Sequence, residues 1–227
     1  MNDEFIKLLE LEYEELKLGL SKASIEGKGT PQEISDRREE LFHSLFEKYF
    51  PFPYRITKGN IIADIGTDHG YVPIYLVEKG ICPKAYAMDI NQGPIESAIK
   101  NIENYGLSEK IQAIKSNGLE KLEPEKADTI IIAGMGGELI VNILENGLAK
   151  LENCSRPVKE LVLSPHKRGD LVRKYLEEHK WHITDEKMLI DMNKFYTIIK
   201  AEKGQESYPY SETELLYGRI LLDRQDA

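Results

Sequence analysis

The spacing of apolar residues changes near residue 58. Before that point, apolar positions recur with the helical period over residues 4–18 and again over residues 41–49, which predicts two amphipathic helices. A stretch rich in turn residues separates them, and two prolines end the second helix. We therefore predict a helical extension over residues 1–58, followed by a larger domain over residues 59–227.

From residue 59 onward, strand-like apolar runs alternate with helix-like segments. The predicted strands lie at residues 61–64, 85–89, 111–115, 129–132 and 161–163, and a β pair follows at 182–189 and 195–201. The predicted helices lie at residues 71–80, 94–105, 138–150, 169–179 and 211–223. This alternation predicts an α/β fold with a mostly parallel, doubly wound sheet, covered by helices on both faces and closed by a C-terminal antiparallel hairpin.

Composition and charge narrow the classes of function. Of the 227 residues, 41 % are apolar, which is enough to bury a sizeable core. The net charge of −9 argues against nucleic-acid binding over the whole surface, although it leaves room for a local basic patch. Apolar runs stay well short of the ~20 residues of a membrane span, and the first residues lack a signal-peptide pattern. We therefore expect a cytoplasmic protein that does not contact membranes.

The cysteines and histidines do not suggest a metal site. Cys82 and Cys154 have no metal-ligand spacing, and two cysteines are too few for a disulfide framework. His179 and His182 have no carboxylate partner at a metal-binding distance along the chain. We predict no metal, and the sequence does not indicate an oligomeric state.

The loop after the first predicted strand has an unusual combination of glycines and carboxylates. Ligands of doubly wound sheets bind at the carboxyl ends of the strands, which directs attention to this loop. Gly66 and Gly70 allow a sharp turn and a close ligand, while Asp64 and Asp68 would repel a pyrophosphate. A dinucleotide is therefore disfavoured, and a ligand with a cationic amino-acid end fits better.

The loops after the next strands indicate a nucleoside. Asp89 ends the second strand, where a carboxylate can accept both hydroxyl groups of a ribose. Ile90 lies beside it, and Asn117 and Gly118 follow the third strand, where they can meet an adenine edge. S-Adenosylmethionine is a ligand of this kind, because it contains a nucleoside and no pyrophosphate. We assign Asp64 and Gly66 to its methionine end.

The loop after the fourth predicted strand contains three glycines in the five residues 133–137. Such a density has two explanations: the turn requires positive φ angles, or a substrate must approach the backbone closely. We favour the second explanation. Ala133 and Gly134 come first in this loop and are assigned to the donor side.

Two runs of sequence resemble a known family. Residues 62–73 (IADIGTDHGYVP) resemble the first motif of the bacterial tRNA (adenine-22-N1)-methyltransferases, and residues 132–137 (IAGMGG) resemble their fourth motif. The resemblance covers about residues 59–222. It implies a Rossmann-like class I methyltransferase fold, S-adenosylmethionine as the methyl donor, and transfer to N1 of an adenine in the D-arm region of tRNA. Further matches in place are Asp89 with Gly93–Pro94, Gly118–Leu119, Leu163–Ser164–Pro165 and Lys194–Phe195–Tyr196.

The chain also departs from that family. The stretch before the first motif is longer, Asn117 stands where the family often has Asp, and Ser164 replaces a common Gln. The family's helical coiled coil, which is expected to grip tRNA, has no counterpart before Ala227. We therefore expect these departures to affect the choice of substrate more than the binding of the methyl donor.

The chemistry of methyl transfer to adenine N1 predicts catalytic roles in the first loop. Attack by adenine N1 places positive charge on the base, and a nearby carboxylate stabilises that charge. Asp68 is the predicted main catalytic residue, and capping of the helix at 71–80 is an additional role compatible with it. His69 is expected to position groups, because N1 has no proton to lose. Tyr71 either stacks on the target base or packs as an aromatic residue at the helix start.

Substrate contacts are expected at the same edge of the sheet. An enzyme acting on structured RNA must extrude its target base, and the expected contacts to that base are Met135, Gly136, Gly137, Pro165 and His166. The cationic cluster of Lys167, Arg168 and Arg173, with Lys174, is the predicted phosphate-binding site. A solvated helix face is the alternative reading of these cations.

Two other functions fit parts of the sequence. The first is a methyltransferase acting on another RNA site or on a small nucleoside, which the negative net charge and the lack of a coiled coil favour. The second is an inactive S-adenosylmethionine-binding protein with an interaction role. The intact Asp68 and the glycine-rich loops speak against the second function, because an inactive protein needs neither.

Overall fold

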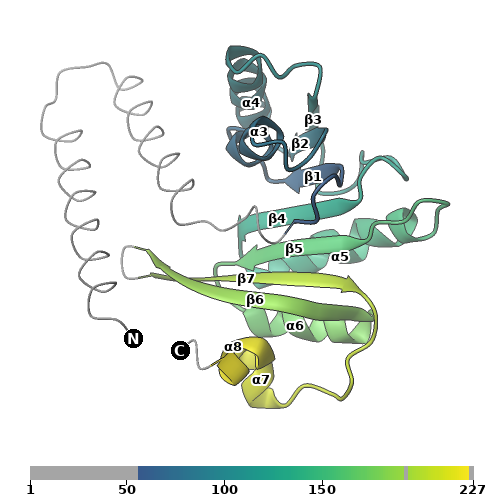
Figure 1. Ribbon diagram of the computed structural model, residues 1–227, viewed down its shortest axis with the longest axis vertical. Coiled ribbons are helices and arrows are strands. Elements are labelled where there is room, and N and C mark those ends of the chain that lie inside the picture. Colours follow the sequence, from purple (N-terminus) through teal and green to yellow (C-terminus); the bar gives the residue numbers. More distant parts are fainter. Residues whose placement is uncertain (1–55, 192–193, 225–227) are drawn as a thin grey trace, which may run out of the picture. The chain divides into compact units, whose positions relative to one another are not determined.

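The computed structural model describes residues 56–191 and 194–224 (Figure 1). The helices predicted over residues 4–18 and 41–49 lie outside the described residues. The predicted division of the chain at residues 58 and 59 therefore stays a prediction.

Seven strands form one sheet in the order β3-β2-β1-β4-β5-β7-β6 (Figure 1). The first five strands run parallel, and β7 runs antiparallel to both β5 and β6. The strands are β1 (Ile62–Ile65), β2 (Ala85–Asp89), β3 (Ile111–Lys115), β4 (Thr129–Met135), β5 (Glu160–Pro165), β6 (Trp181–Asp191) and β7 (Lys194–Lys203). The helices are α3 (Tyr71–Glu78), α4 (Gln92–Asn104), α5 (Gly137–Glu152), α6 (Gly169–Glu178), α7 (Glu212–Tyr217) and α8 (Arg219–Arg224).

The central strands are apolar on both sides because helices cover both faces of the sheet. Every residue of β1 and β5 is buried, whereas the edge strand β3 mixes buried and exposed positions. The largest core cluster joins the sheet to α5 and α6, and includes Ile132 and Leu163 from the strands and Ile140 and Leu144 from α5. The predicted α/β sheet with its closing hairpin is confirmed.

The sheet has a topological switch between β1 and β4. From β1 the chain proceeds outward to β2 and β3, and it then returns to β4 on the other side. Because crossovers between parallel strands are right-handed, this reversal puts α3 and α4 on one face and α5 and α6 on the other. Figure 1 shows α3 and α4 grouped with β1, β2 and β3. In folds of this type ligands bind outside the carboxyl ends of the strands at such a switch, which here are the ends of β1 and β4.

Two predicted elements differ in detail. The strand predicted at 129–132 continues to Met135, with a shift of register at Gly134. The helix predicted over 211–223 is two helices, because Gly218 adopts a φ of 90° between α7 and α8. Among the described helices, none has the length and apolar character needed to cross a membrane.

The structure corrects the prediction that Arg173 contacts phosphate. Its side chain is only 2 % exposed, and its Nε donates to Glu186 Oε1 at 2.7 Å. Its Nη1 also donates to the carbonyl oxygen of Leu215 in α7, while Glu186 accepts from the amide of Ile220 in α8. The arginine therefore holds the last helices in place and does not face solvent.

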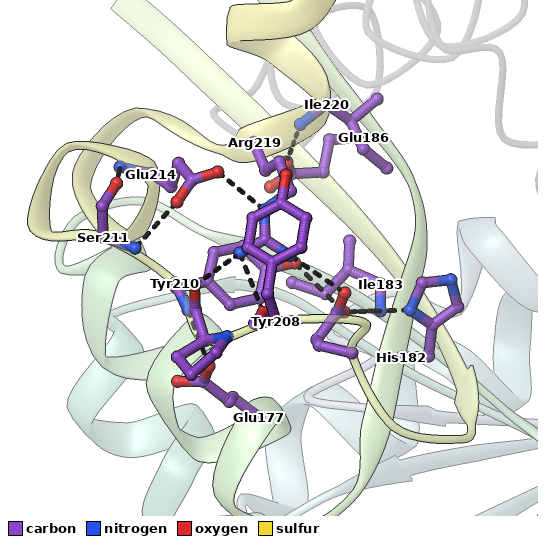
Figure 2. Close-up of polar contacts among 12 residues, drawn as sticks. Glu177, His182, Ile183, Glu186, Tyr208, Tyr210, Ser211, Glu214, Arg219 and Ile220 are labelled. Atoms are coloured by element: carbon purple, nitrogen blue, oxygen red, sulfur yellow. Dashed lines mark hydrogen bonds and ion pairs between the residues drawn. The ribbon is translucent and has the colours of Figure 1, made fainter.

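A second arginine completes this buried cluster (Figure 2). The guanidinium of Arg219 lies 4.0 Å from the ring centre of Tyr208 and 3.8 Å from that of Tyr210. It also donates to the carboxylates of Glu206 and Glu214. Figure 2 shows Glu214 and the two tyrosines around this arginine. Arg219 thereby fastens α8 to α7 and to the segment before it, while Arg173 and Glu186 connect these helices to α6 and β6.

Replacement of Arg173 by alanine is expected to lower the free energy of unfolding by about 3–5 kcal/mol, because it leaves Glu186 buried without a partner. Urea denaturation measures this change. The matched control is Lys174→Ala, which removes an exposed cation of the same helix from a surface ion pair and should cost at most about 1 kcal/mol. Unchanged stability of R173A together with weaker RNA binding would restore the phosphate assignment.

Candidate functional site

The first loop of the site follows β1 and contains a buried carboxylate. Asp64 is buried, and its Oδ2 accepts a hydrogen bond from Thr67 Oγ1 at 2.7 Å. Gly66 has a φ of 77°, and its amide donates to the Met88 carbonyl oxygen at 2.7 Å. A Cβ atom on Gly66 would lie 2.1 Å from Met135 Cε, so no larger residue fits while Met135 keeps this position. The bare backbone of Gly66 therefore joins the ends of β1 and β4.

Burial raises the pKa of Asp64 from its ordinary value of 3.8 to about 7. The hydrogen bond from Thr67 lowers the pKa, and the negative charge of Asp89 raises it further. Between about pH 4 and pH 7 the folded protein therefore retains a proton that the unfolded chain releases, and the contribution of Asp64 to stability declines as the pH rises. A cationic ligand near Asp64 would favour the ionised form.

Affinity for S-adenosylmethionine is expected to fall about tenfold for each pH unit below 7, because binding of the cationic donor then requires Asp64 to lose its proton. Calorimetric titration with S-adenosylmethionine across this pH range measures the effect. The control is Asp64→Asn, which should bind S-adenosylmethionine more weakly at high pH and with an affinity that does not depend on pH. The same pH profile in both proteins would show that Asp64 is not the titrating group.

The second loop brings Asp89 close to the first loop. Its Oδ1 accepts from the Asn91 amide at 2.9 Å, and its Oδ2 accepts from the Asp68 amide at 3.4 Å. Ile90, the next residue, is 55 % exposed, which is unusual for isoleucine and leaves an apolar surface beside the carboxylate. A ribose on Asp89 and an apolar base face on Ile90 are compatible with this arrangement.

The third loop lies against the second. The Ser116 amide donates to the Asp89 carbonyl oxygen at 2.8 Å, and the Ser116 hydroxyl donates to the Gly118 carbonyl oxygen at 2.9 Å. Gly118 has a φ of 53°, and a Cβ atom there would lie 3.0 Å from Ile143 Cγ2. These contacts bring Asn117 and Gly118 to the same edge as Asp89.

Different structural constraints act on the glycines in the loop after β4. Gly134 has a φ of 76° at the register shift between Ala133 and Met135, so the backbone itself requires glycine. At Gly137 a Cβ atom would lie 2.1 Å from the Arg168 carbonyl oxygen. The close neighbour of Gly137 is therefore the chain's own backbone, and the favoured explanation of an approaching substrate is wrong for this residue. Gly136 lies beside the Lys167 side chain.

Asp68 is the most accessible carboxylate of the first loop. Its side chain is 69 % exposed, and its Oδ2 lies 3.5 Å from His69 Nε2. The rings of His69 and Tyr71 stack with their centres 5.8 Å apart. The N-cap of α3 is Gly70, without a side-chain hydrogen bond, so the predicted capping role of Asp68 is wrong. With a φ of 52°, Asp68 turns the chain two residues before that cap.

The loop after β5 supplies the remaining predicted residues. Pro165 is the buried last residue of β5, and His166 donates its amide to the Met135 carbonyl oxygen at 2.8 Å. Lys167 is exposed, whereas Arg168 forms ion pairs with Asp170 at 3.0 Å and Glu138 at 3.4 Å. Lys167 is therefore the more available cation of the two, while Arg173 lies in the buried cluster described above.

The sequence analysis matched Tyr196 to the family but did not assign it to the site. Its ring lies 5.6 Å from that of His166, measured between centres, with an angle of 79° between the planes. The predicted antiparallel hairpin held the signal, because an antiparallel last strand must begin at the edge where β5 ends. Tyr196 therefore joins the residues grouped at the carboxyl edge.

A separate cavity of about 730 Å³ lies beside the edge strand β3. Lys115, Lys121 and Lys150 line it, and Glu120 and Glu123 offset part of their charge. None of the predicted site residues lines this cavity. The convergence of Asp64, Asp68 and Asp89 makes the carboxyl edge the better candidate for the functional site.

Comparison with known proteins covers the part of the chain that carries this edge. A family model described as "Methyltransferase domain" matches residues 54–199. The tRNA (adenine(22)-N(1))-methyltransferase of Bacillus subtilis is 36 % identical over 166 residues, which are 73 % of this chain and 68 % of that protein.

Solved structures extend the likeness to three dimensions. The B. subtilis M1A22 tRNA methyltransferase TrmK is 34 % identical, with a TM-score of 0.71 over 77 % of this chain and 75 % of that one. A Streptococcus pneumoniae protein in complex with S-adenosyl-L-methionine is 41 % identical, with a TM-score of 0.71 over 76 % of this chain and 78 % of that one. The resemblance found in the motifs is thereby confirmed, and the chain belongs to the family of bacterial tRNA (adenine-22-N1)-methyltransferases.

Proposed function

We propose that this protein transfers the methyl group of S-adenosylmethionine to N1 of adenine 22, in the D-arm region of tRNA. The observation that carries the proposal is the hydrogen bond from the Asp68 amide to the Asp89 carboxylate. This bond connects Asp89, the carboxylate suited to the donor's ribose, to the loop of Asp68, the carboxylate suited to the target base. Membership of the methyltransferase family supports the same assignment.

The donor site is proposed to use four features of the edge. Asp89 accepts the ribose hydroxyl groups, and Ile90 with Asn117 flanks the adenine. The ionised Asp64 attracts the cationic methionine end, and the Gly66 backbone borders the same end of the donor. S-Adenosylmethionine supplies an activated methyl group on a sulfonium, and the protein holds this group in line with the nucleophile.

The reaction needs positioning and charge stabilisation. The lone pair of adenine N1 forms the new N–C bond, and the electron pair of the broken C–S bond stays on sulfur. Positive charge thereby moves from the donor to the adenine ring, and no proton is lost. Asp68 is proposed to accept from the N6 amino group and to offset the new charge. His69 orients Asp68 across their 3.5 Å contact.

Binding of tRNA is proposed at the same edge. The exposed Lys167 is the cation best placed to contact a phosphate, and Met135 lies between the donor loop and His166, where an extruded base would enter. A tRNA substrate also agrees with the proposed cytoplasmic location. The negative net charge restricts phosphate contacts to such local sites.

Transfer of labelled methyl from S-adenosylmethionine to unmodified tRNA transcripts tests the proposal. Because N1-methyladenine blocks base pairing, reverse transcription should stop at adenine 22. A transcript with guanine at that position is the control and should remain unlabelled. Labelling of free adenosine or short oligonucleotides as readily as tRNA would favour the small-nucleoside alternative. Donor binding without labelling of any RNA would favour the inactive binding protein.

A further inference from the structure

The start of β7 brings an aromatic residue to the edge of the site. The strands β5 and β7 pair with Val162 opposite Lys200 and Leu163 opposite Ile199. Continuing this antiparallel register by three residues places His166 opposite Tyr196, which explains their ring contact at 5.6 Å. The two rings belong to segments thirty residues apart in the chain, and the strand register brings them together.

The pair lies on the same face of the sheet as Asp64. Side chains alternate between faces along a strand, and residues paired across strands share a face. Asp64 pairs with Ile131, Ile131 pairs with Val162, and Val162 pairs with Lys200. Tyr196 is four residues before Lys200 and therefore points to this face.

A chain of contacts connects the aromatic pair to the donor loop. The Met135 methyl group lies against the bare backbone of Gly66, and the Met135 carbonyl oxygen accepts the His166 amide at 2.8 Å. A Cβ atom on Gly134 would lie only 3.9 Å from His166 Nε2, so bare backbone also borders the imidazole. His166 is therefore the hydrogen-bonded neighbour of Met135, and Met135 in turn contacts Gly66 of the donor loop.

We propose that Tyr196 and His166 form an aromatic platform that positions the target adenine beside the methyl donor; this inference rests on the proposed function. Two rings at 79° offer a face for stacking on one side of a base and an edge for its rim. Methylation at N1 makes the adenine cationic, and the face of an aromatic ring attracts a cation. The platform holds the extruded base and stabilises the charge that appears on it.

The first experiment measures steady-state methylation of tRNA by Tyr196→Ala and Tyr196→Phe. Loss of a stacking ring should lower kcat/KM about 10- to 100-fold in Tyr196→Ala, mainly through kcat, because phosphate contacts that dominate tRNA binding remain. Tyr196→Phe keeps the ring face and should retain most of the activity. Donor affinity, measured by calorimetry, should change less than about threefold in both variants.

Phe195 provides the matched control. It is 63 % exposed and lies next to Tyr196 in β7, where alternation points it to the opposite face of the sheet. Phe195→Ala removes a ring of similar size from the same strand and should leave kcat/KM within about threefold of the wild type. An equal loss in both alanine variants would indicate a damaged hairpin and would overturn the inference.

The second experiment does not depend on turnover. A D-arm RNA with 2-aminopurine at the target position is mixed with protein saturated with S-adenosylhomocysteine, and fluorescence reports extrusion and stacking of that base. The wild type and Tyr196→Phe should change the fluorescence, and Tyr196→Ala should not. This pattern in a protein without methylation activity would reject the proposed function and support the platform. Full activity of Tyr196→Ala, or no fluorescence change with the wild type, would overturn the platform.

Discussion

Asp89→Ala is expected to weaken S-adenosylmethionine binding about 100-fold or more. The substitution removes both carboxylate oxygens that can accept the ribose hydroxyl groups, and each such charge-assisted hydrogen bond is worth about 1.5–3 kcal/mol. It also leaves the Asn91 amide, now 2.9 Å from Oδ1, without its acceptor. Isothermal titration calorimetry measures the dissociation constant directly.

Asp89→Asn provides a graded comparison. The amide keeps one acceptor oxygen and the shape of the side chain, so its loss of affinity should be smaller than that of the alanine variant. Circular dichroism establishes that both variants are folded. Donor affinity within a few fold of the wild type in Asp89→Ala would show that Asp89 is not the ribose ligand.

Asp68→Asn is expected to lower kcat about 100-fold while donor affinity changes little. The substitution removes the negative charge that offsets the developing charge on adenine. Asparagine tolerates the φ of 52°, and the backbone amide still donates to Asp89. Single-turnover methyl transfer to tRNA measures the rate of the chemical step, and calorimetry measures the affinity for the donor.

The variant is informative because the Asp68 side chain is 69 % exposed and does not cap α3. Stability should therefore remain close to that of the wild type, whereas Asp68→Ala would add the cost of an alanine in the left-handed region, about 1–2 kcal/mol. Glu103→Gln, which removes an exposed carboxylate from α4, is the charge control and should be fully active. Activity of Asp68→Asn equal to that control would remove Asp68 from the mechanism.

The local sequence pattern predicted the structure correctly where residues close together in the chain determine it. The alternation of apolar runs and helical segments predicted the parallel sheet and its closing hairpin. The carboxylates Asp64 and Asp89 end predicted strands, and parallel strands end at a common edge, so their convergence could be anticipated. The two glycine-rich motifs were also sufficient to recognise the family.

Local pattern failed where distant residues decide the structure. Arg173 follows two cations and resembles a solvated helix residue, yet Glu186 in β6 and the α7 carbonyl of Leu215 bury it. Gly137 resembled a substrate contact, but the backbone of Arg168, thirty-one residues away, fills the space. Neither neighbour can be inferred from the sequence beside the residue.

The sequence by itself determined the order of the elements, the residues at the strand ends and the family of this protein, because these depend on periodicity and on short motifs. Only the tertiary structure decided which residues of the carboxyl edge face the site. The register between β5 and β7 sets His166 against Tyr196, and a shift of one residue would turn Tyr196 to the other face. Such a register follows from packing across the whole sheet, which no local pattern contains.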